Sequence, residues 1–149
     1  MRKDEFERLY DHALSIATFA HQGQKDKAGQ EYIGHPVVVA SRCKTYEAKI
    51  AALLHDTIED TYITADHLRV MGIPEEIVDA VVLVTKHKDN PGYSYLRYLW
   101  AIKKNPIACE VKIADLSHNM DLRRLPRITA HALRRNVKYQ LSYSFLSLL

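Results

Sequence analysis

The residues best suited to chemistry lie in the segment 53–61, which reads Leu-Leu-His-Asp-Thr-Ile-Glu-Asp-Thr. This segment places His55 beside Asp56, and Glu59 and Asp60 follow. If the segment is one helix, positions i, i+1, i+4 and i+5 lie on one side of it, so the imidazole and the three carboxylates share a face. The apolar run that leads into His55 indicates a buried helix, and buried acids need a counter-charge. A divalent cation would supply that charge.

Two other segments offer side chains of the same kind. His35 precedes a proline that can open a helix, so His35 is expected at an N-cap-like position. Asp115 lies inside an apolar segment, and Asn119 follows one helical turn later, where it points the same way and can touch a substrate. The expected metal ligands are His35, His55, Asp56 and Asp115. This mixed nitrogen and oxygen set suits Mn²⁺ or another divalent transition metal better than Ca²⁺ or Mg²⁺.

Each of these residues also has a purely structural interpretation. The His-Asp pair can be a hydrogen-bonded structural pair, and His35 can simply cap a helix. Asp115 can be an ordinary buried acid bonded to Asn119 or to a backbone amide. Glu59 and Asp60 can form a solvated helix end. The sequence alone leaves these alternatives open beside the metal site.

The elements that must position these residues are helical almost throughout. Apolar residues recur at steps of three and four along residues 4–22, which predicts a first helix ended by Gly23. A second helix is expected from Pro36. The β-branched run 80–84 is either a short strand or a buried helix, and its helical flanks favour the helix. Later helix starts are expected at Thr64, Pro74, Ser94, Asn105 and Thr129. We therefore expect an all-α bundle.

The order of the candidate residues resembles that of the HD metal-dependent phosphohydrolases. Within them, the chain is most similar to the Rel/Spo-type alarmone hydrolase domain and its small stand-alone relatives. The matching segments are 19–24, 32–36, 53–61 and 112–120. They run from the first expected helix into the last third of the chain, so we expect one HD phosphohydrolase domain over residues 1–149. The resemblance implies a helical bundle with the metal between helices, and hydrolysis that removes pyrophosphate from a ribose 3′ position.

The chemistry expected of the site follows from the residue types. A divalent metal lowers the pKa of a bound water from about 15.7 toward 7 and offsets charge on a phosphoryl oxygen. Glu59 and Asp60 are expected to orient or deprotonate that water, and the resemblance gives this pair the same work. His21 and His118 lie in matching segments and are expected to support the site through hydrogen bonds.

The loop that follows the first expected helix departs from the family. Alarmone hydrolases carry an Arg-Lys pair there, whose arginine stacks on guanine, whereas this chain has Asp26-Lys27, with Lys25 just before. Lys25 and Lys27 are expected to meet phosphate, but a carboxylate cannot serve as a stacking surface. If this loop limits guanine recognition, Asp26→Arg should improve it. A cation is also missing directly after Asp115, where the family has Arg or Lys.

Three functions are compatible with these features. The leading hypothesis is Mn²⁺-dependent removal of the 3′-pyrophosphate from (p)ppGpp. The second keeps the phosphohydrolase but changes the nucleotide, for instance to NADPH or a nucleoside phosphate. The third is a helical domain that senses a nucleotide without catalysis, which the acidic pair Glu59 and Asp60 argues against because a sensor needs no water-activating acids. A synthetase is not expected, since the hydrolase-like segments fill the chain.

Composition and charge limit the possible partners. A net charge of +3 without a Lys/Arg stripe suits a small anionic molecule and does not favour nucleic acid. No run of 18 apolar residues is present, so no membrane span is expected. Cys43 and Cys109 lie outside any CxxC pattern, which is typical of a reducing compartment such as the cytoplasm.

The basic cluster 123–127 and Arg134-Arg135 is either solvated or a phosphate-gathering rim. The apolar tail 141–149 packs either on the first helix or on another subunit, so a homo-oligomer is possible.

Overall fold

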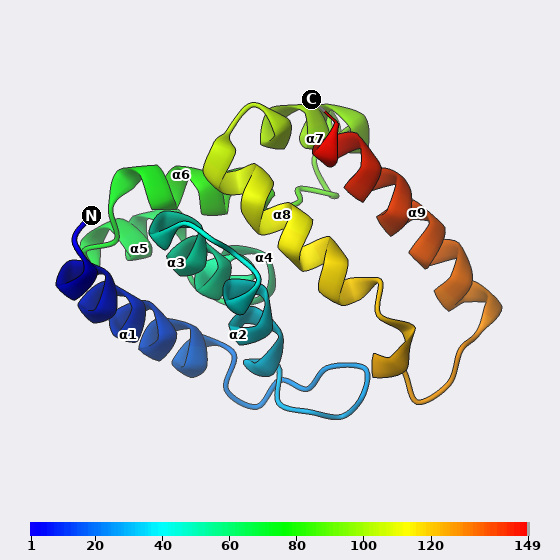
Figure 1. Ribbon diagram of the computed structural model, residues 1–149, viewed down its shortest axis with the longest axis horizontal. Helices are drawn as coiled ribbons and strands as arrows, with labels where there is room; N and C mark the ends of the chain where they lie inside the picture. Colours follow the sequence, from blue (N-terminus) through cyan, green and yellow to red (C-terminus); the bar gives the residue numbers. More distant parts are fainter. Residues whose placement is uncertain (149) are drawn as a thin grey trace.

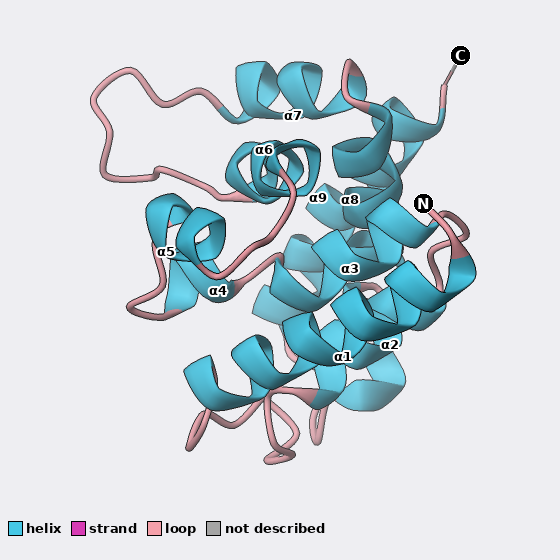
Figure 2. Ribbon diagram, turned by 90° about the vertical axis from the view of Figure 1, so that its left-hand side faces the viewer, coloured by secondary structure: helices cyan, strands magenta, loops and turns pink. Residues whose placement is uncertain are grey.

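The computed structural model describes residues 1–148, and all regular secondary structure in that range is helical (Figure 1, Figure 2). In chain order the elements are α1 (Lys3–Ala20), α2 (Gly34–Ser41), α3 (Tyr46–Leu54), α4 (Thr57–Asp60), α5 (Ala65–Val70), α6 (Glu75–Val84), α7 (Tyr95–Lys103), α8 (Pro106–Asn119), the 3₁₀ helix η1 (Leu122–Arg124) and α9 (Ala130–Ser147). The expected all-α class is therefore confirmed. The run 80–84 ends α6, so the strand alternative is not adopted.

Short polar side chains set where most of the longer helices begin. Thr45, Thr64, Ser94, Asn105 and Thr129 each occupy the N-cap and accept a hydrogen bond from the backbone N–H three residues on. Such a bond satisfies one of the donors that the first turn leaves free. The expected starts of α5, α7, α8 and α9 are therefore confirmed with their local cause.

The core is built around α3, which lies in the middle of the bundle (Figure 2). Ala48 and the run Ile50–Leu54 are almost completely buried. Helices α1, α2, α6 and α8 pack against α3 on its several sides. Because residues 50–54 are apolar on every side, this end of α3 is held as an interior helix and not as an amphipathic surface helix. The end of α3, where His55 follows, is thereby fixed in the interior.

The segment 53–61 is not one continuous helix, and the prediction that its acids share one helical face is wrong. Helix α3 ends at Leu54, and α4 begins at Thr57. The N–H of His55 bonds to the carbonyl of Ala52, three residues back, at 3.3 Å. The hydroxyl of Thr57 donates to the carbonyl of Leu54 at 2.8 Å and occupies an acceptor of the next helical turn. The chain therefore turns between His55 and Asp56, and this turn brings their side chains together.

The C-terminal helix lies along one side of the bundle, where it packs on α8 and α7 (Figure 1). Leu146 is buried, and the ammonium of Lys103 donates to the carbonyls of Phe145 at 2.5 Å and Leu148 at 2.6 Å. The tail thus packs within the chain, but against helices other than the first one. Leu149, the end of that predicted segment, lies outside the described residues. None of the described helices has both the length and the hydropathy to cross a membrane.

Candidate active site

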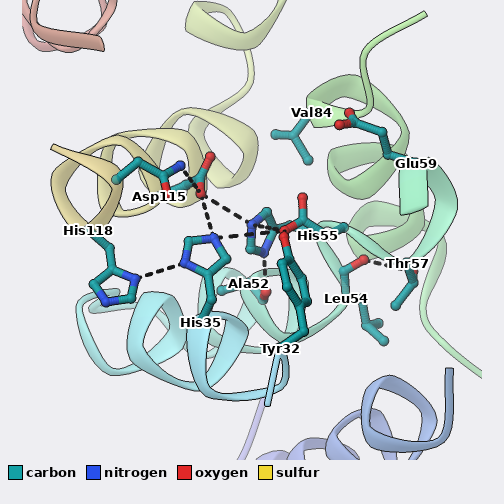
Figure 3. Close-up of polar contacts among 12 residues, drawn as sticks. Tyr32, His35, Ala52, Leu54, His55, Thr57, Glu59, Val84, Asp115 and His118 are labelled. Carbon is teal, nitrogen blue, oxygen red and sulfur yellow. Dashed lines mark hydrogen bonds and ion pairs between the residues drawn. The ribbon is translucent and has the colours of Figure 1, made fainter. Parts of the chain in front are cut away.

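Three buried side chains from separate helices meet in the interior. His35 comes from the first turn of α2, His55 from the end of α3, and Asp115 from α8. The Nε2 atom of His35 lies 2.8 Å from Asp115 Oδ1, and the Nε2 atom of His55 lies 3.4 Å from the same oxygen. Figure 3 shows these three side chains pointing toward one another. One nitrogen or oxygen of each lies within 4.8 Å of the others, a spacing that a single metal ion can bridge.

Asp56, the fourth expected ligand, lies beside this group. Its Oδ2 atom is 3.1 Å from His55 Nε2 and 3.8 Å from His35 Nε2. The hydroxyl of Tyr32 donates to the same oxygen at 2.5 Å and holds the carboxylate in place. The burial of the Tyr32 hydroxyl, together with Asp56, raises the pKa of Tyr32, so the hydroxyl stays a donor. The structure therefore brings together all four residues that the sequence marks as ligands.

The imidazole of His55 shows that this group fits a cation. Its Nδ1 lies 2.6 Å from the carbonyl of Ala52, which can only accept, so Nδ1 carries a proton. In the neutral ring, the lone pair on Nε2 then faces the carboxylates of Asp56 and Asp115. This Nε2 is buried and has no hydrogen-bond partner within residues 1–148. Burial alone would lower the pKa of His55, but the two carboxylates raise it well above its usual value. The raised pKa means that the carboxylates favour a second proton, on Nε2 of His55. A divalent cation would occupy the same place between the Nε2 lone pair and the carboxylates.

His35 does not act as a helix cap. Helix α2 begins at Gly34 with Ile33 at the N-cap, and no side chain caps it. The second ring nitrogen of His35, Nδ1, lies 2.8 Å from Nδ1 of His118. The expected support of the site by His118 is therefore confirmed. His21 bonds instead to Gln24, through Nδ1 and Oε1 at 2.9 Å.

A buried lysine that the sequence analysis did not single out contacts the same carboxylate. The ammonium of Lys112 donates to Asp115 Oδ2 at 3.1 Å and lies 5.7 Å from the centre of the Tyr98 ring. Burial would lower the pKa of Lys112, but Asp115 raises it above its usual value. The i, i+3 spacing of Lys112 and Asp115 on a helix is the sequence signal for this pair.

The acidic pair on α4 adjoins the cluster through Asp56. Carboxylate oxygens of Asp56, Glu59 and Asp60 lie within 4.8 Å of one another. Glu59 Oε1 accepts the backbone N–H of Lys86 at 2.7 Å, which fixes its direction. Burial, and then the carboxylates of Asp56 and Glu59, raise the pKa of Asp60 to about 6. Both acids are exposed, yet both line the cavity that contains the cluster, so they are more than a solvated helix end.

A cavity of about 360 Å³ opens over the cluster. The residues expected to bind substrate, Lys25, Lys27 and Asn119, all line it. Asn119 Nδ2 donates to Asp115 Oδ1 at 3.1 Å, so its amide is tied to the cluster. Further lining residues that the sequence analysis did not assign to the site are Lys86, Asn136 and Tyr139. Arg124 and Arg135, from the basic cluster, line the cavity as well.

The basic cluster divides between the cavity and the surface. Arg124 and Arg135 line the cavity, whereas the side chain of Arg123 is 91% exposed and pairs with Asp121 at 2.9 Å. Burial, and then Arg135 and Arg124, lower the pKa of Lys27, which shows that these three cations lie near one another. The cluster is therefore neither wholly solvated nor wholly a rim of the cavity. Which arginine faces the cavity depends on how η1 and α9 pack, and the spacing of the arginines along the sequence does not reveal this.

The chain is similar in sequence to part of several curated proteins. A protein of Haemophilus influenzae named guanosine-3′,5′-bis(diphosphate) 3′-pyrophosphohydrolase is 37% identical, over 70% of this chain and 17% of that protein. The bifunctional (p)ppGpp synthase/hydrolase SpoT of Escherichia coli is 35% identical, over 79% of this chain and 18% of that protein. A GTP pyrophosphokinase of Streptomyces coelicolor is 34% identical, over 76% of this chain and 14% of that protein. The chain thus spans less than a fifth of the length of these relatives. No family model matches the chain.

The fold has a counterpart among solved structures. A metazoan ortholog of SpoT that hydrolyses ppGpp superposes with a TM-score of 0.76, over 93% of this chain and 84% of that chain. The two sequences are 22% identical. This match confirms the expected helical architecture at the level of the whole bundle.

Proposed function

We propose that this chain, which resembles the Rel/Spo-type alarmone hydrolases in sequence and has the fold of a ppGpp hydrolase, removes the 3′-pyrophosphate from (p)ppGpp. We propose further that residues 1–149 form a single HD phosphohydrolase domain. The observation that carries the proposal is the convergence of His35, His55, Asp56 and Asp115 under a cavity lined by cations. The names of the curated relatives support the choice of substrate.

In this proposal the four converging residues hold a divalent metal, which we propose to be Mn²⁺. Two imidazole nitrogens and two carboxylates form a ligand set that suits transition metals better than Ca²⁺ or Mg²⁺. When bound, the metal lowers the pKa of a water and offsets charge on a phosphoryl oxygen. The unpartnered Nε2 of His55 supports this assignment, because it faces carboxylates that offer it no proton.

The protein's own residues supply the rest of the reaction. Glu59 and Asp60 orient the attacking water and take its proton, and a pKa of about 6 leaves Asp60 ionised at neutral pH. The water oxygen bonds to the phosphorus attached to O3′, the P–O3′ bond breaks, and O3′ takes up a proton. The products are GDP or GTP and pyrophosphate. Lys25 and Lys27, which line the cavity, bind phosphate, and Asn119 positions the substrate over the cluster.

We propose that the partner is this small nucleotide alone, with neither nucleic acid nor membrane involved, and that the chain acts in the cytoplasm. The free thiols Cys43 and Cys109 support a reducing compartment. A homo-oligomer is compatible with the apolar side chains exposed along α9, which include Leu133, Val137 and Leu141.

The test is turnover of ppGpp by the purified chain with added Mn²⁺, followed by chromatography of the nucleotide products, with EDTA as the blank. GDP and pyrophosphate in equal amounts are the expected products, and His55→Ala serves as the inactive control. A panel with NADPH and nucleoside phosphates is run beside it. Turnover of a panel nucleotide without turnover of ppGpp would reassign the substrate. Tight nucleotide binding without any turnover would favour a sensor.

A further inference from the structure

Arg124 lines the cavity and is tied to the His-Asp cluster through Asn119. Its Nη1 donates to Asn119 Oδ1 at 3.2 Å and to the carbonyl of His118 at 3.3 Å. Asn119 in turn donates from Nδ2 to Asp115 Oδ1 at 3.1 Å. A continuous chain of hydrogen bonds therefore runs from the cluster to the guanidinium. These hydrogen bonds fix the position of Arg124 relative to the cluster.

The other end of the guanidinium faces the loop that precedes α2. Its Nη2 lies 3.8 Å from Asp26 Oδ2, and both side chains are largely buried, 24% and 15% exposed. In Figure 1 this loop runs along the bottom of the molecule toward the turn that carries Arg124. The ion pair therefore joins two walls of the cavity and holds the guanidinium between them.

These contacts engage N–H groups at the edge of the Arg124 guanidinium, so a ring that stacks on it would use the flat face instead. The group is held by acceptors at its edge, and the Asp26 carboxylate offsets its charge. A second anion near that carboxylate would be repelled, whereas a neutral ring stacked on the guanidinium plane would not. No aromatic side chain of residues 1–148 is recorded in a cation–π contact with Arg124.

The neighbouring cations differ from Arg124 in this respect. Lys27, Lys86 and Arg135 also line the cavity, and none of them forms a salt bridge within the described part of the chain. Their charges remain available for phosphate groups. The cavity therefore separates cations with free charge from one planar cation whose charge is already matched.

We propose that Arg124 is the platform on which the base of the bound nucleotide stacks. This inference rests on the proposed function, since it assigns the base-binding position of that same site. Stacking depends little on which base is present, so Arg124 sets the affinity for a nucleobase in general. Lys27 and Arg135 set the affinity for phosphate. In this proposal the base lies against Arg124 and the phosphate that is hydrolysed lies over the cluster.

The test compares two ligands that differ in the base. Binding of GMP and of ribose 5-phosphate is measured by calorimetry, with Mn²⁺ added, for the parent chain and for Arg124→Lys. The lysine keeps the charge and the pairing with Asp26 but lacks the plane. We expect GMP to bind about 5- to 100-fold more weakly to Arg124→Lys, the range of one base stack, while ribose 5-phosphate binds unchanged. With ppGpp, KM should rise by a similar factor and kcat should stay within about threefold.

Arg123→Lys is the matched control, because it makes the same exchange in the same turn, outside the cavity. It should leave both affinities unchanged. An equal loss of GMP and ribose 5-phosphate binding in Arg124→Lys would overturn the proposal, as would unchanged GMP binding or a parent chain that binds both ligands alike. If the parent chain fails to turn over ppGpp but the base-dependent loss appears, the proposed reaction fails and the platform stands.

Discussion

The imidazole rings of His35 and His118 lie almost parallel, at an angle of 12°, with centroids 5.0 Å apart and Nδ1 atoms 2.8 Å from each other. One of these two nitrogens must carry the proton between them. Burial, and then Arg124 and His35, lower the pKa of His118 to about 4, so its ring is neutral and can accept. When His118 accepts, His35 carries its proton on Nδ1 and keeps the Nε2 lone pair for a metal.

Replacing His118 with leucine should therefore weaken metal binding. The substitution removes the acceptor that selects the tautomer of His35, and losses of about 10- to 100-fold are usual for such partners. Calorimetric titration with Mn²⁺ measures the change. His118→Asn, whose side-chain oxygen can accept, should recover part of the affinity. Equal affinities for the leucine variant and the parent chain would show that His118 does not position His35.

Replacing His55 with alanine should remove the metal, the activity and the thermal response to Mn²⁺ together. Without the imidazole, Asp56 and Asp115 face each other with one ligand fewer. In the parent chain, Mn²⁺ at about 100 times its Kd should add about 2.7 kcal/mol to the free energy of unfolding. Thermal melts with Mn²⁺ and with EDTA give the comparison. A variant that still gains stability from Mn²⁺ would contradict the assignment of His55 as a ligand.

Replacing Glu59 with glutamine should lower the rate and spare the metal. The amide oxygen can still accept the N–H of Lys86, so the turn keeps its shape, but it cannot take a proton from water. We expect kcat for ppGpp to fall by about 100-fold or more, with Mn²⁺ affinity within about threefold of the parent. Turnover and titration are measured on the same preparation. Unchanged turnover would remove Glu59 from the catalytic pair.

The activity should fall in mildly acidic solution because of Asp60. Its carboxyl has a pKa of about 6, raised by burial and by Asp56 and Glu59, so it is ionised above that pH and protonated below it. A protonated carboxyl cannot accept a proton, so kcat/KM for ppGpp should decline as the pH falls through about 6. Asp60→Asn should be slow and should lack this decline. Metal occupancy is checked at each pH, and persistence of the decline in Asp60→Asn would assign it to another group.

The structure reverses the expectation for Asp26→Arg. Asp26 Oδ1 accepts the backbone N–H groups of Ala28 and Gln30, each at 2.9 Å, and its other oxygen faces Arg124. An arginine there would lose both loop bonds and stand against a like charge. We now expect KM for ppGpp to rise several-fold and the melting temperature to fall. Asp26→Asn, which keeps the loop acceptor, is the milder control, and a gain in kcat/KM for Asp26→Arg would restore the first expectation.

The sequence was sufficient where local rules decide the structure. Thr64, Ser94, Asn105 and Thr129 are short polar residues before apolar periodicity, and each caps a helix as expected. The convergence of the expected metal ligands was also foreseeable, from their residue types and from the resemblance, although they come from helices far apart in the chain. A hydrogen bond from His118 to the site was expected, but the sequence did not identify His35 as its partner.

The sequence was insufficient where side chains compete with the backbone. The helix that the sequence predicted through His55 ends at Leu54, where the Thr57 hydroxyl donates to the carbonyl of Leu54. Likewise, the sequence shows only that Asp26 stands where the family has an arginine. In the structure its carboxylate accepts hydrogen bonds within the loop and pairs with Arg124. Long-range pairs of this kind leave no trace in spacing, because they depend on how the elements pack.

The lysine beneath the cluster decides the charge that an arriving phosphate meets. Lys112 occupies Oδ2 of Asp115, so only Oδ1 is directed at the histidines and this aspartate is a one-oxygen donor. The two carboxylates of Asp56 and Asp115 and the one ammonium carry a formal charge of about −1, which a bound divalent ion would change to about +1. Without Lys112, the two carboxylates would cancel the charge of a bound divalent ion. With Lys112, one positive charge would remain to attract an anion.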